Sequence, residues 1–565
     1  MQPITKTIEA VSGSHTARSV AGEAQAGCLQ TDPHASNATL DDHRPSSMDE
    51  TNDLLTGTGY LESLRDGREV YIHGERVKDV TTHPAFRNSA RSIARLYDSL
   101  HDPAMMETLT AVDQFGHRTH KFFKPSCDAR ELSEARDAIA AWARLSYGFM
   151  GRTPDYKAAF MATLGADPSF YAPFEANALN WYKKYASRAL FLNHVIVNPP
   201  VDRKKPVHEV ADVFVHVLKE TDGGIVVSGA KMLATGSALT HATFVAQNSA
   251  TELQKGKAED FALVFLAPMD TPGTRLISRT SYEERSSRHP FDYPLSSRFD
   301  ENDAVLIFEN AFIPWENVLV YRDIQKATAF YAASGFFNRY NLQSGTRLGV
   351  KLDFMAGLFA KGIVSNGTDD FRGIQVALGD IIAWRHLIWA LTSAMVLDPQ
   401  KGPGQSVIPK LENAATLRLF ATECWPAVHR IFETYLGGSP LVTPSSCLDL
   451  KNPALAPTIE KYYRGSDCSA VQRIKLFKLI WDAIGSEFGG RHMLYEINYA
   501  GNFEQVRIDC LNFAKRKGLI DAFTQSVDRC MSEYDLDGWT NPIWSPGDYA
   551  APRPNSAMPD KGVRP

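Results

Sequence analysis

The pattern of hydrophobic and polar positions divides the chain into three stretches. Between residues 91 and 165, apolar side chains recur every three or four positions, as at Ile93, Leu96 and Leu100, and this spacing predicts amphipathic helices. A stretch with period two follows, and after Trp315 the helical spacing returns and continues almost to the end. The order helix, strand, helix favours a mainly helical α+β fold over a fold of alternating β and α elements.

The middle stretch has the alternation that is typical of strands. Val213, Val215 and Val217 alternate with other residues, a Thr-Asp-Gly-Gly turn follows at 221–224, and Ile225 opens a β-branched run. This arrangement predicts a hairpin. Further strands are predicted at 261–266, 274–278 and 304–308, between turns rich in Pro and Gly.

These periods also suggest the domains. We expect a mainly helical N-terminal domain at 48–190, a β domain at 191–320 and a helical bundle at 321–540. Residues 1–47 contain few large apolar side chains and lack the apolar run of a secretory signal, so they are predicted to be a disordered extension whose deletion preserves activity. Residues 541–565 are rich in Pro, Gly and Ser and are predicted to be a flexible tail.

Composition and charge restrict the class of protein. The 565 residues are 44% hydrophobic and 22% charged, so the chain can bury a large core. The 60 Lys and Arg against 65 Asp and Glu give a net charge of −5, without a basic run that would suggest a nucleic-acid partner. The longest apolar runs, at 261–268 and 387–397, are too short to cross a membrane. Seven scattered cysteines without a C-x-x-C pair argue against a zinc site, and we expect a soluble cytoplasmic protein with no metal.

Common catalytic signatures are missing from the sequence, which contains no G-x-G-x-x-G, H-E-x-x-H or G-x-S-x-G. The segment 224–231 resembles a phosphate-binding loop, but it has Ala230 where such a loop needs Lys, and β-branched residues occupy its centre. We therefore interpret this segment as a strand.

Three residues could act together on a phenol. The segment 153–155, Thr-Pro-Asp, has the residue types of a helix start, which would put Arg152 just before the first turn and Tyr156 on it. His194 lies in an apolar segment, where a histidine is usually structural, and a capped helix start would explain the other two. A phenol, however, has a pKa of about 10. An enzyme that attacks its ring needs a base or fixed cations to favour the phenolate, and these three side chains would supply them.

The segment GSEFGGRH at 485–492 follows an apolar helical stripe that runs from Val471 to Ile484. Its glycines are typical of a helix C-terminus. Alternatively, Gly489 and Gly490 let the backbone approach a phosphate, with Arg491 close by to balance the charge.

Six longer strings, taken in order, resemble one family. They are YLESLRDGREVYI (60–72), VKDVTTHPAFRN (77–88), GRTPDYKA (151–158), DYPLSSRFDEND (292–303), PWENV (314–318) and GSEFGGRH (485–492). These strings are similar to the oxygenase component of two-component 4-hydroxyphenylacetate 3-monooxygenases, and the resemblance runs from about Gly57 to Trp539.

The resemblance implies an acyl-CoA-dehydrogenase-like fold whose C-terminal bundle binds FAD and assembles a homotetramer. FAD would be used as FADH2, a diffusible cosubstrate that a separate NAD(P)H:flavin reductase delivers. With O2 it would form a C4a-hydroperoxyflavin that hydroxylates a small para-substituted phenol ortho to its hydroxyl. The implied reaction converts 4-hydroxyphenylacetate to 3,4-dihydroxyphenylacetate.

The resemblance also implies roles for particular residues. Arg152, Tyr156 and His194 would be catalytic and contact the phenol oxygen, and Ser249 and Ala250 would receive the substrate carboxylate from a mobile loop. Thr235 would lie near the flavin ring. Further flavin contacts are implied for His194, Val195, Ile196, Pro200, Val201, Asp202, Arg203, Phe488, Gly489, Gly490 and Arg491.

Several alternatives remain open from the sequence. Halophenol monooxygenases and tyrosine or coumarate hydroxylases share the fold and the flavin chemistry. A 4-hydroxybutyryl-CoA dehydratase would need clustered cysteines for an iron–sulfur cluster, and Arg152 and Tyr156 stand near where some are expected. A non-enzymatic scaffold is disfavoured because Arg152, Tyr156, His194 and Thr235 are all present.

Overall fold

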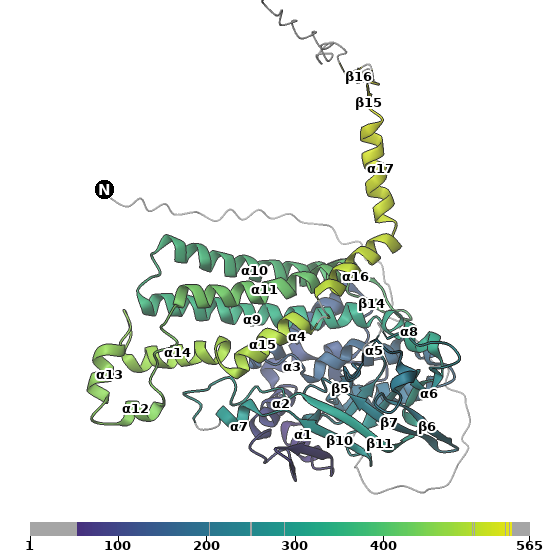
Figure 1. Cartoon of the computed structure of the whole chain (residues 1–565), viewed down its shortest axis with the longest axis horizontal. Helices are drawn as coiled ribbons and strands as arrows, with labels where there is room; N and C mark the ends of the chain where they lie inside the picture. Colours follow the sequence, from purple (N-terminus) through teal and green to yellow (C-terminus); the bar gives the residue numbers. More distant parts are fainter. Residues whose placement is uncertain are drawn as a thin grey trace, which may run out of the picture. The chain divides into compact units, whose positions relative to one another are not determined.

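The computed structural model describes residues 53–202, 204–248, 251–286, 289–499, 501, 503–536, 538–541 and 543–544. These residues form helices, then two sheets, then a long helical segment (Figure 1). The predicted mainly helical α+β fold is therefore confirmed. The expectations for residues 1–47, for Arg203, Ser249 and Ala250, and for nearly all of the tail lie outside the described residues.

The first part of the chain is mostly helical. α2 buries Ile93, Leu96 and Tyr97, and the next long helix buries Ile139 and Trp142, as their spacing predicts. The helices are α1 (Gly57–Ser63), α2 (Arg87–Ser99), α3 (Pro103–Leu109), α4 (Ala129–Leu145), α5 (Ala158–Ala166) and α6 (Glu175–Arg188), with 3-10 turns η1 (Lys121–Phe123), η2 (Pro154–Lys157) and η3 (Pro168–Tyr171). A small hairpin of β3 (Thr110–Val112) and β4 (Arg118–His120) lies between α3 and α4.

A six-stranded sheet has the order β2-β1-β10-β11-β7-β6. Its strands are β1 (Glu69–Ile72), β2 (Glu75–Arg76), β6 (His216–Thr221), β7 (Gly224–Lys231), β10 (Thr274–Ser278) and β11 (Ala304–Pro314). The predicted hairpin is β6 and β7, although Val213 lies in a turn and Val215 precedes β6. The segment that resembles a phosphate-binding loop is a strand, as expected. β1 comes from the N-terminal helical part and pairs in parallel with β10. The sheet therefore extends beyond residues 191–320.

A second sheet carries His194. Its order is β12-β9-β8-β5, from β5 (Leu192–Val195), β8 (Ala242–Val245), β9 (Leu263–Pro268) and β12 (Val318–Tyr321). β5 pairs in parallel with β8, and His194 stands opposite Phe244 in this register. All four residues of β8 are buried, so the sheet is part of the core.

The C-terminal segment is helical. α9, α10 and α11 pack side by side (Figure 1). The helices are α8 (Ile324–Ala333), α9 (Phe336–Asn366), α10 (Arg372–Leu397), α11 (Leu411–Leu436), α12 (Cys447–Lys451), α13 (Ala456–Tyr463), α14 (Ala470–Ile484), α15 (Glu487–Asn498), α16 (Phe503–Arg516) and α17 (Leu519–Met531). The predicted stripe is on α14, where Ile474, Phe477 and Ile480 are buried, but Val471 at its start is 46% exposed.

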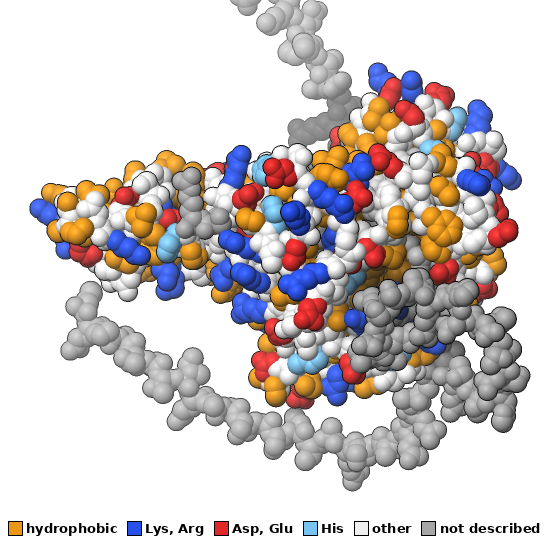
Figure 2. Space-filling view, turned by 90° about the horizontal axis from the view of Figure 1, so that it is seen from below, with side chains coloured by type: hydrophobic (Ala, Val, Ile, Leu, Met, Phe, Trp, Pro, Cys, Tyr) orange, Lys and Arg blue, Asp and Glu red, His pale blue; other side chains and the backbone are white. Residues whose placement is uncertain are grey.

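The surface is mixed in charge. On the face shown in Figure 2, Lys and Arg side chains are interspersed with Asp and Glu. One described helix, α10, is long and apolar enough to cross a membrane by length and composition alone, and it packs against α9 and α11.

Candidate active site

The segment before α5 begins a helix at Pro154, as predicted, but as the 3-10 turn η2. Thr153 is the N-cap residue and Pro154 follows it in the first turn, as predicted, but the Thr153 side chain accepts no backbone N–H. Its hydroxyl instead donates to the Asp155 carboxylate at 2.5 Å, and Nε2 of Gln343 on α9 approaches the same oxygen at 3.3 Å. Burial raises the pKa of Asp155 to about 6, although these hydrogen bonds oppose the rise. Asp155 therefore serves as a buried acceptor that ties η2 to α9.

Arg152 and Tyr156 lie together, as their positions around the helix start suggest. The guanidinium carbon of Arg152 is 3.9 Å from the centroid of the Tyr156 ring, a cation–π distance. Nη1 of Arg152 is buried and has no hydrogen-bond partner in the described chain. Burial raises the pKa of the Tyr156 phenol, so this side chain is a neutral O–H at ordinary pH. The unpartnered Nη1 is a donor available to a ligand.

His194 joins this pair from β5. Its ring centroid is 5.8 Å from that of Tyr156, and its Nδ1 lies 2.6 Å from Nζ of Lys157. Phe160 and Phe336 pack against the same imidazole, at 6.1 Å each. Burial lowers the pKa of His194 well below its usual value, and the neighbouring cations lower it further. The imidazole is therefore neutral.

Lys157 was not predicted from the sequence. Its side chain is 2% exposed, and its Nζ lies 4.0 Å from the centroid of the Tyr156 ring. Burial lowers its pKa well below the usual value, and Arg152 adds to this effect. The residue stands in the string GRTPDYKA beside two predicted residues, but nothing in that string shows that its nitrogen reaches His194.

Thr235 lies beside a carboxylate that the sequence reasoning also missed. Its hydroxyl donates to Oδ1 of Asp303 at 2.6 Å, while Nη2 of Arg491 and Nε of Arg279 reach the same carboxylate at 3.1 Å each. Burial alone would raise the pKa of Asp303, but the two guanidinium groups hold it well below its usual range. Thr235 and Arg491, predicted as separate flavin contacts, thus meet at one carboxylate.

Glu301 connects the two clusters. One carboxylate oxygen accepts the backbone N–H of Arg152, and the other pairs with Nη1 of Arg491 at 3.1 Å. A hydrogen-bonded path therefore runs from the Arg152 loop to helix α15. Glu301 and Asp303 both lie in DYPLSSRFDEND, one of the strings on which the resemblance rests. Nothing in that string indicates which residues the two carboxylates contact.

The glycines of GSEFGGRH have two different positions. Gly485 ends α14, as expected for a helix C-terminus, whereas Gly489 and Gly490 lie in the first turn of α15, capped by Ser486. A Cβ on Gly489 would meet the Ile484 carbonyl carbon at 2.6 Å, whereas a Cβ on Gly490 would have open space. An open first turn of a helix suits an anionic group such as a phosphate.

The remaining predicted flavin residues lie on or after β5. Val195 is buried, Ile196 and Asp202 are partly exposed, and Pro200 and Val201 are exposed. Phe488 is buried against Phe149 and His492. Within the described residues, no group of three His, Cys, Asp or Glu side chains could hold a metal ion.

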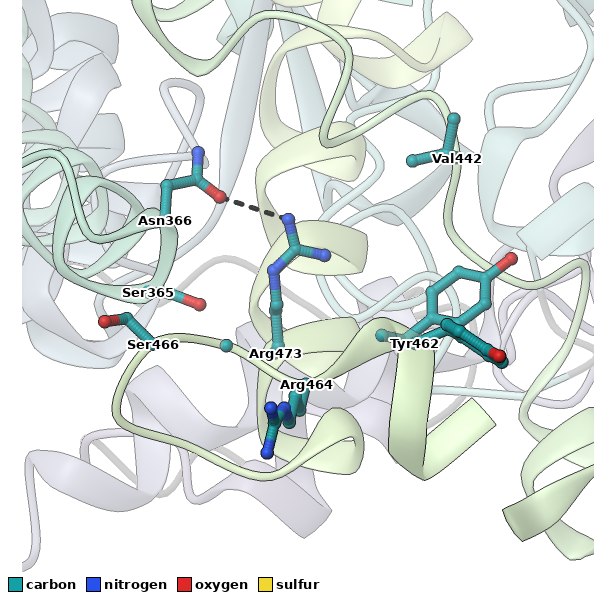
Figure 3. A pocket seen from close by; sticks show the side chains of 9 residues that line it. Ser365, Asn366, Val442, Tyr462, Arg464, Ser466 and Arg473 are labelled. Carbon is teal, nitrogen blue, oxygen red and sulfur yellow. Dashed lines mark hydrogen bonds between the residues drawn. The ribbon is translucent and has the colours of Figure 1, made fainter. Parts of the chain in front are cut away.

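A cavity of about 470 Å³ lies elsewhere, between the end of α9 and the start of α14 (Figure 3). Nη2 of Arg473 donates to Oδ1 of Asn366 at 3.1 Å on its wall. None of the predicted site residues lines this cavity.

Comparisons with known proteins show the family of the chain. The family model for the 4-hydroxyphenylacetate 3-hydroxylase N terminal matches residues 56–320, and that for the C terminal matches residues 327–528. The pyoverdin chromophore biosynthetic protein PvcC of Pseudomonas aeruginosa is 57% identical over 493 residues, which cover 87% of this chain and 98% of that protein. The 4-hydroxyphenylacetate 3-monooxygenase oxygenase component of Klebsiella oxytoca is 50% identical over 499 residues, which cover 87% and 95%.

A solved structure extends the likeness to the fold. The crystal structure of the oxygenase component HpaB of 4-hydroxyphenylacetate 3-monooxygenase, complexed with FAD and 4-hydroxyphenylacetate, matches with a TM-score of 0.79 at 30% identity. The match covers 84% of this chain and all of that one. The chain therefore belongs to the 4-hydroxyphenylacetate 3-hydroxylase family, as an FAD-dependent oxygenase component of a two-component aromatic hydroxylase.

Proposed function

We propose that this chain hydroxylates a para-substituted phenol ortho to its hydroxyl, and that it converts 4-hydroxyphenylacetate to 3,4-dihydroxyphenylacetate. The observation that carries the proposal is the convergence of Arg152, Tyr156 and His194, which come from two segments of the chain and meet beside aromatic walls. An unpartnered buried guanidinium nitrogen is suited to a phenolate oxygen, because a charge-assisted hydrogen bond satisfies both groups.

Two features of the site suit a bound flavin. The Tyr495 hydroxyl is buried without a hydrogen-bond partner among the described residues, and the first turn of α15 is open at Gly490. Thr235 and the segments 194–196, 200–203 and 488–491 would hold FAD. Reduced FAD supplies the activation of O2, which no protein side chain provides. As an oxygenase component, the protein depends on a flavin reductase for FADH2, and we propose that the reductase is a separate NAD(P)H-dependent cytoplasmic protein.

The side chains of the site would prepare the phenol for attack. Arg152 binds the phenol oxygen and lowers the cost of its negative charge, which activates the ortho carbon. His194 contacts the same oxygen, and the aromatic walls Phe160 and Phe336 exclude water. Ser249 and Ala250 would meet the carboxylate of the para substituent.

A second substrate is favoured by one observation. The identity of 57% to PvcC exceeds the 50% to the Klebsiella enzyme, over nearly the same residues. Identity therefore does not single out 4-hydroxyphenylacetate, and the alternative is a phenol of the tyrosine or coumarate class, which the sequence leaves open and for which the chemistry at the ring would be the same.

The experiment mixes the purified protein anaerobically with FADH2 and a phenol, admits O2, and assays catechol and hydrogen peroxide. With 4-hydroxyphenylacetate we expect a near-stoichiometric yield of 3,4-dihydroxyphenylacetate. Peroxide alone with this phenol, together with catechol from tyrosine or coumarate, would transfer the assignment to the second substrate. Peroxide without catechol from every phenol would contradict the proposal.

We also propose that the chain forms a homotetramer through its C-terminal helices. On α10, Val376, Ile382 and Leu397 are exposed, and α17 buries none of its residues while it exposes Phe523 and Val527. Apolar side chains gathered on helices in this way are typical of surfaces between subunits.

A further inference from the structure

The contact between Lys157 and His194 is unusual in its surroundings. Nζ of Lys157 lies 2.6 Å from Nδ1 of His194, and this is the one hydrogen bond that the lysine nitrogen makes within the described chain. The lysine is 2% exposed, with the Tyr156 ring 4.0 Å from its nitrogen. A lysine is rarely buried so completely without a carboxylate in contact. The His194 imidazole is the one described hydrogen-bond partner at this position.

A neutral imidazole carries a single proton, which sits on one of its two nitrogens. The nitrogen that contacts a hydrogen-bond donor stays bare, and the proton then lies on the other nitrogen. A lysine nitrogen has N–H groups to donate in either of its protonation states. Nε2 of His194 makes no hydrogen bond with any described residue, and the residue is partly exposed. This nitrogen is therefore available to a ligand.

A bound phenolate oxygen determines which ring nitrogen of His194 carries the proton. The oxygen can only accept, so a lone pair on Nε2 would repel it, whereas Nε2–H would bind it. A neutral imidazole that donates from Nε2 has a bare Nδ1, and Lys157 is the donor in contact with Nδ1. Both contacts are satisfied by one arrangement, in which Lys157 donates to Nδ1 and His194 donates from Nε2.

We propose that Lys157 is a positioning residue, which holds Nδ1 of His194 as an acceptor so that His194 donates its Nε2–H to the phenolate oxygen of the substrate. This inference rests on the proposed function, and it makes His194 a hydrogen-bond donor instead of a proton acceptor. The O–H bond of the phenol therefore breaks as the phenolate forms, and its proton is released to the solvent.

Other charged and titratable groups lie around the same pair. Arg152 and Tyr156 belong to the same segment as Lys157. Glu301 accepts the backbone N–H of Arg152, and Arg491 forms an ion pair with Glu301. Glu301 opposes the lowering of the lysine pKa that burial and Arg152 cause. The effect of Lys157 on a bound phenol must therefore be separated from that of Arg152, and the variants below keep Arg152 in place.

The test uses 4-nitrophenol, whose phenolate absorbs visible light, and the full-length protein without flavin. Titration of the bound phenol against pH measures its pKa directly. We expect the wild-type protein to lower this pKa below that of free 4-nitrophenol. Lys157→Met should raise it by at least one unit, which is a tenfold loss of preference for the phenolate. An unchanged pKa in Lys157→Met, or a wild-type protein without preference for phenolate, would overturn the proposal.

A double variant separates positioning from direct charge. His194→Phe keeps an aromatic ring at this place but has no nitrogen or oxygen to which Lys157 could donate. In this background we expect Lys157→Met to change the acid dissociation constant of the bound phenol less than threefold, because Lys157 acts through His194. An equal tenfold effect in both backgrounds would show that the lysine charge acts directly, and would contradict the inference.

A matched control removes another buried lysine. Lys478 on α14 is 8% exposed and pairs with Asp292 at 3.2 Å, so Lys478→Met reports the general cost of losing such a side chain. We expect this variant to bind 4-nitrophenolate as the wild type does. Hydroxylation of phenols by the wild type is assayed separately. An active wild type with an insensitive Lys157→Met would refute the positioning role alone, whereas an inactive wild type would refute the proposed function.

Discussion

Arg152 is held by its backbone and its ring contact, while part of its guanidinium has no partner. Its N–H donates to Glu301 and its guanidinium carbon lies over Tyr156, but Nη1 is buried and unsatisfied. Leaving a buried charged donor unpaired is costly, so such an atom is expected where a ligand completes the site.

Removing this donor should uncouple the reaction. We expect Arg152→Gln and His194→Ala each to lower the catechol yield at least tenfold, because the phenol is no longer held as phenolate while O2 is still reduced. The missing product should be found as hydrogen peroxide per FADH2 consumed.

The control for uncoupling is Arg285→Gln. Arg285 forms an exposed ion pair with Glu487 at 2.7 Å, and such pairs contribute little. Its ratio of catechol to peroxide should equal that of the wild type. The same ratio in Arg152→Gln would remove Arg152 from the mechanism.

At the scale of elements, α15 connects to the rest of the site through both its ends. Its first turn carries Gly489 and Gly490, and further along Glu496 pairs with Arg347 and, at 2.9 Å, with Lys351 on α9. The helix that would receive the flavin phosphates is thus fixed to the bundle by buried charges.

The two glycines of α15 should respond differently to alanine. Gly490→Ala meets nothing in the protein and improves helix propensity, so the thermal midpoint should not fall. If the flavin phosphates approach this turn, the same change should weaken FAD binding at least fivefold in a fluorescence titration. Gly489→Ala would press on the Ile484 backbone and should lower the midpoint. Unchanged FAD affinity in Gly490→Ala would exclude a phosphate at this turn.

The ion cluster between α9 and α15 should make stability sensitive to acid. Burial alone would raise the pKa of Glu496, but Arg347 and Lys351 outweigh it and lower the pKa to about 2. A lowered carboxyl pKa stabilises the fold above the unfolded value of about 4.3 and loses this effect as pH falls toward 2. Between pH 5 and pH 3, the free energy of unfolding should therefore fall by about 2 kcal/mol more in the wild type than in Glu496→Gln.

Urea unfolding at a fixed protein concentration measures this difference. At pH 7, Glu496→Gln should itself lower the stability by about 3–5 kcal/mol, since Arg347 and Lys351 lose their buried partner. Parallel acid profiles in the two proteins would show that the cluster does not set the pH dependence.

At the scale of the whole molecule, exposed apolar side chains on α10 point to assembly. We expect the wild type to elute as a tetramer in size-exclusion chromatography with light scattering. Val376→Glu should shift it toward smaller species, because Val376 is 57% exposed in the single chain and a buried charge at an interface is costly. Leu218→Glu on β6, where Leu218 is 49% exposed, is the control and should leave the tetramer intact. A tetramer in both variants would place the interface elsewhere.

The sequence alone determined the elements whose cause is local. Periods of three to four residues identified α2 and α14, and a period of two with a Gly-rich turn identified the β6–β7 hairpin, because the hydrogen bonds and turn of each element form between near neighbours. The helix start at Thr153 and Pro154 is local in the same sense, but the hydrogen bond of the Thr153 side chain is not, since its hydroxyl donates to a carboxylate that Gln343 of α9 also contacts.

Only the tertiary structure decided which distant residues meet. β1 joins β10 across 206 residues, Lys157 reaches His194 across 37, and Glu301 bridges the Arg152 loop to α15 across gaps of 149 and 190. No periodicity records these contacts, because they depend on how whole elements pack and on which buried charges then need partners. The family and its candidate residues could be identified from strings along the chain, whereas the connections that hold those residues in place follow from the fold.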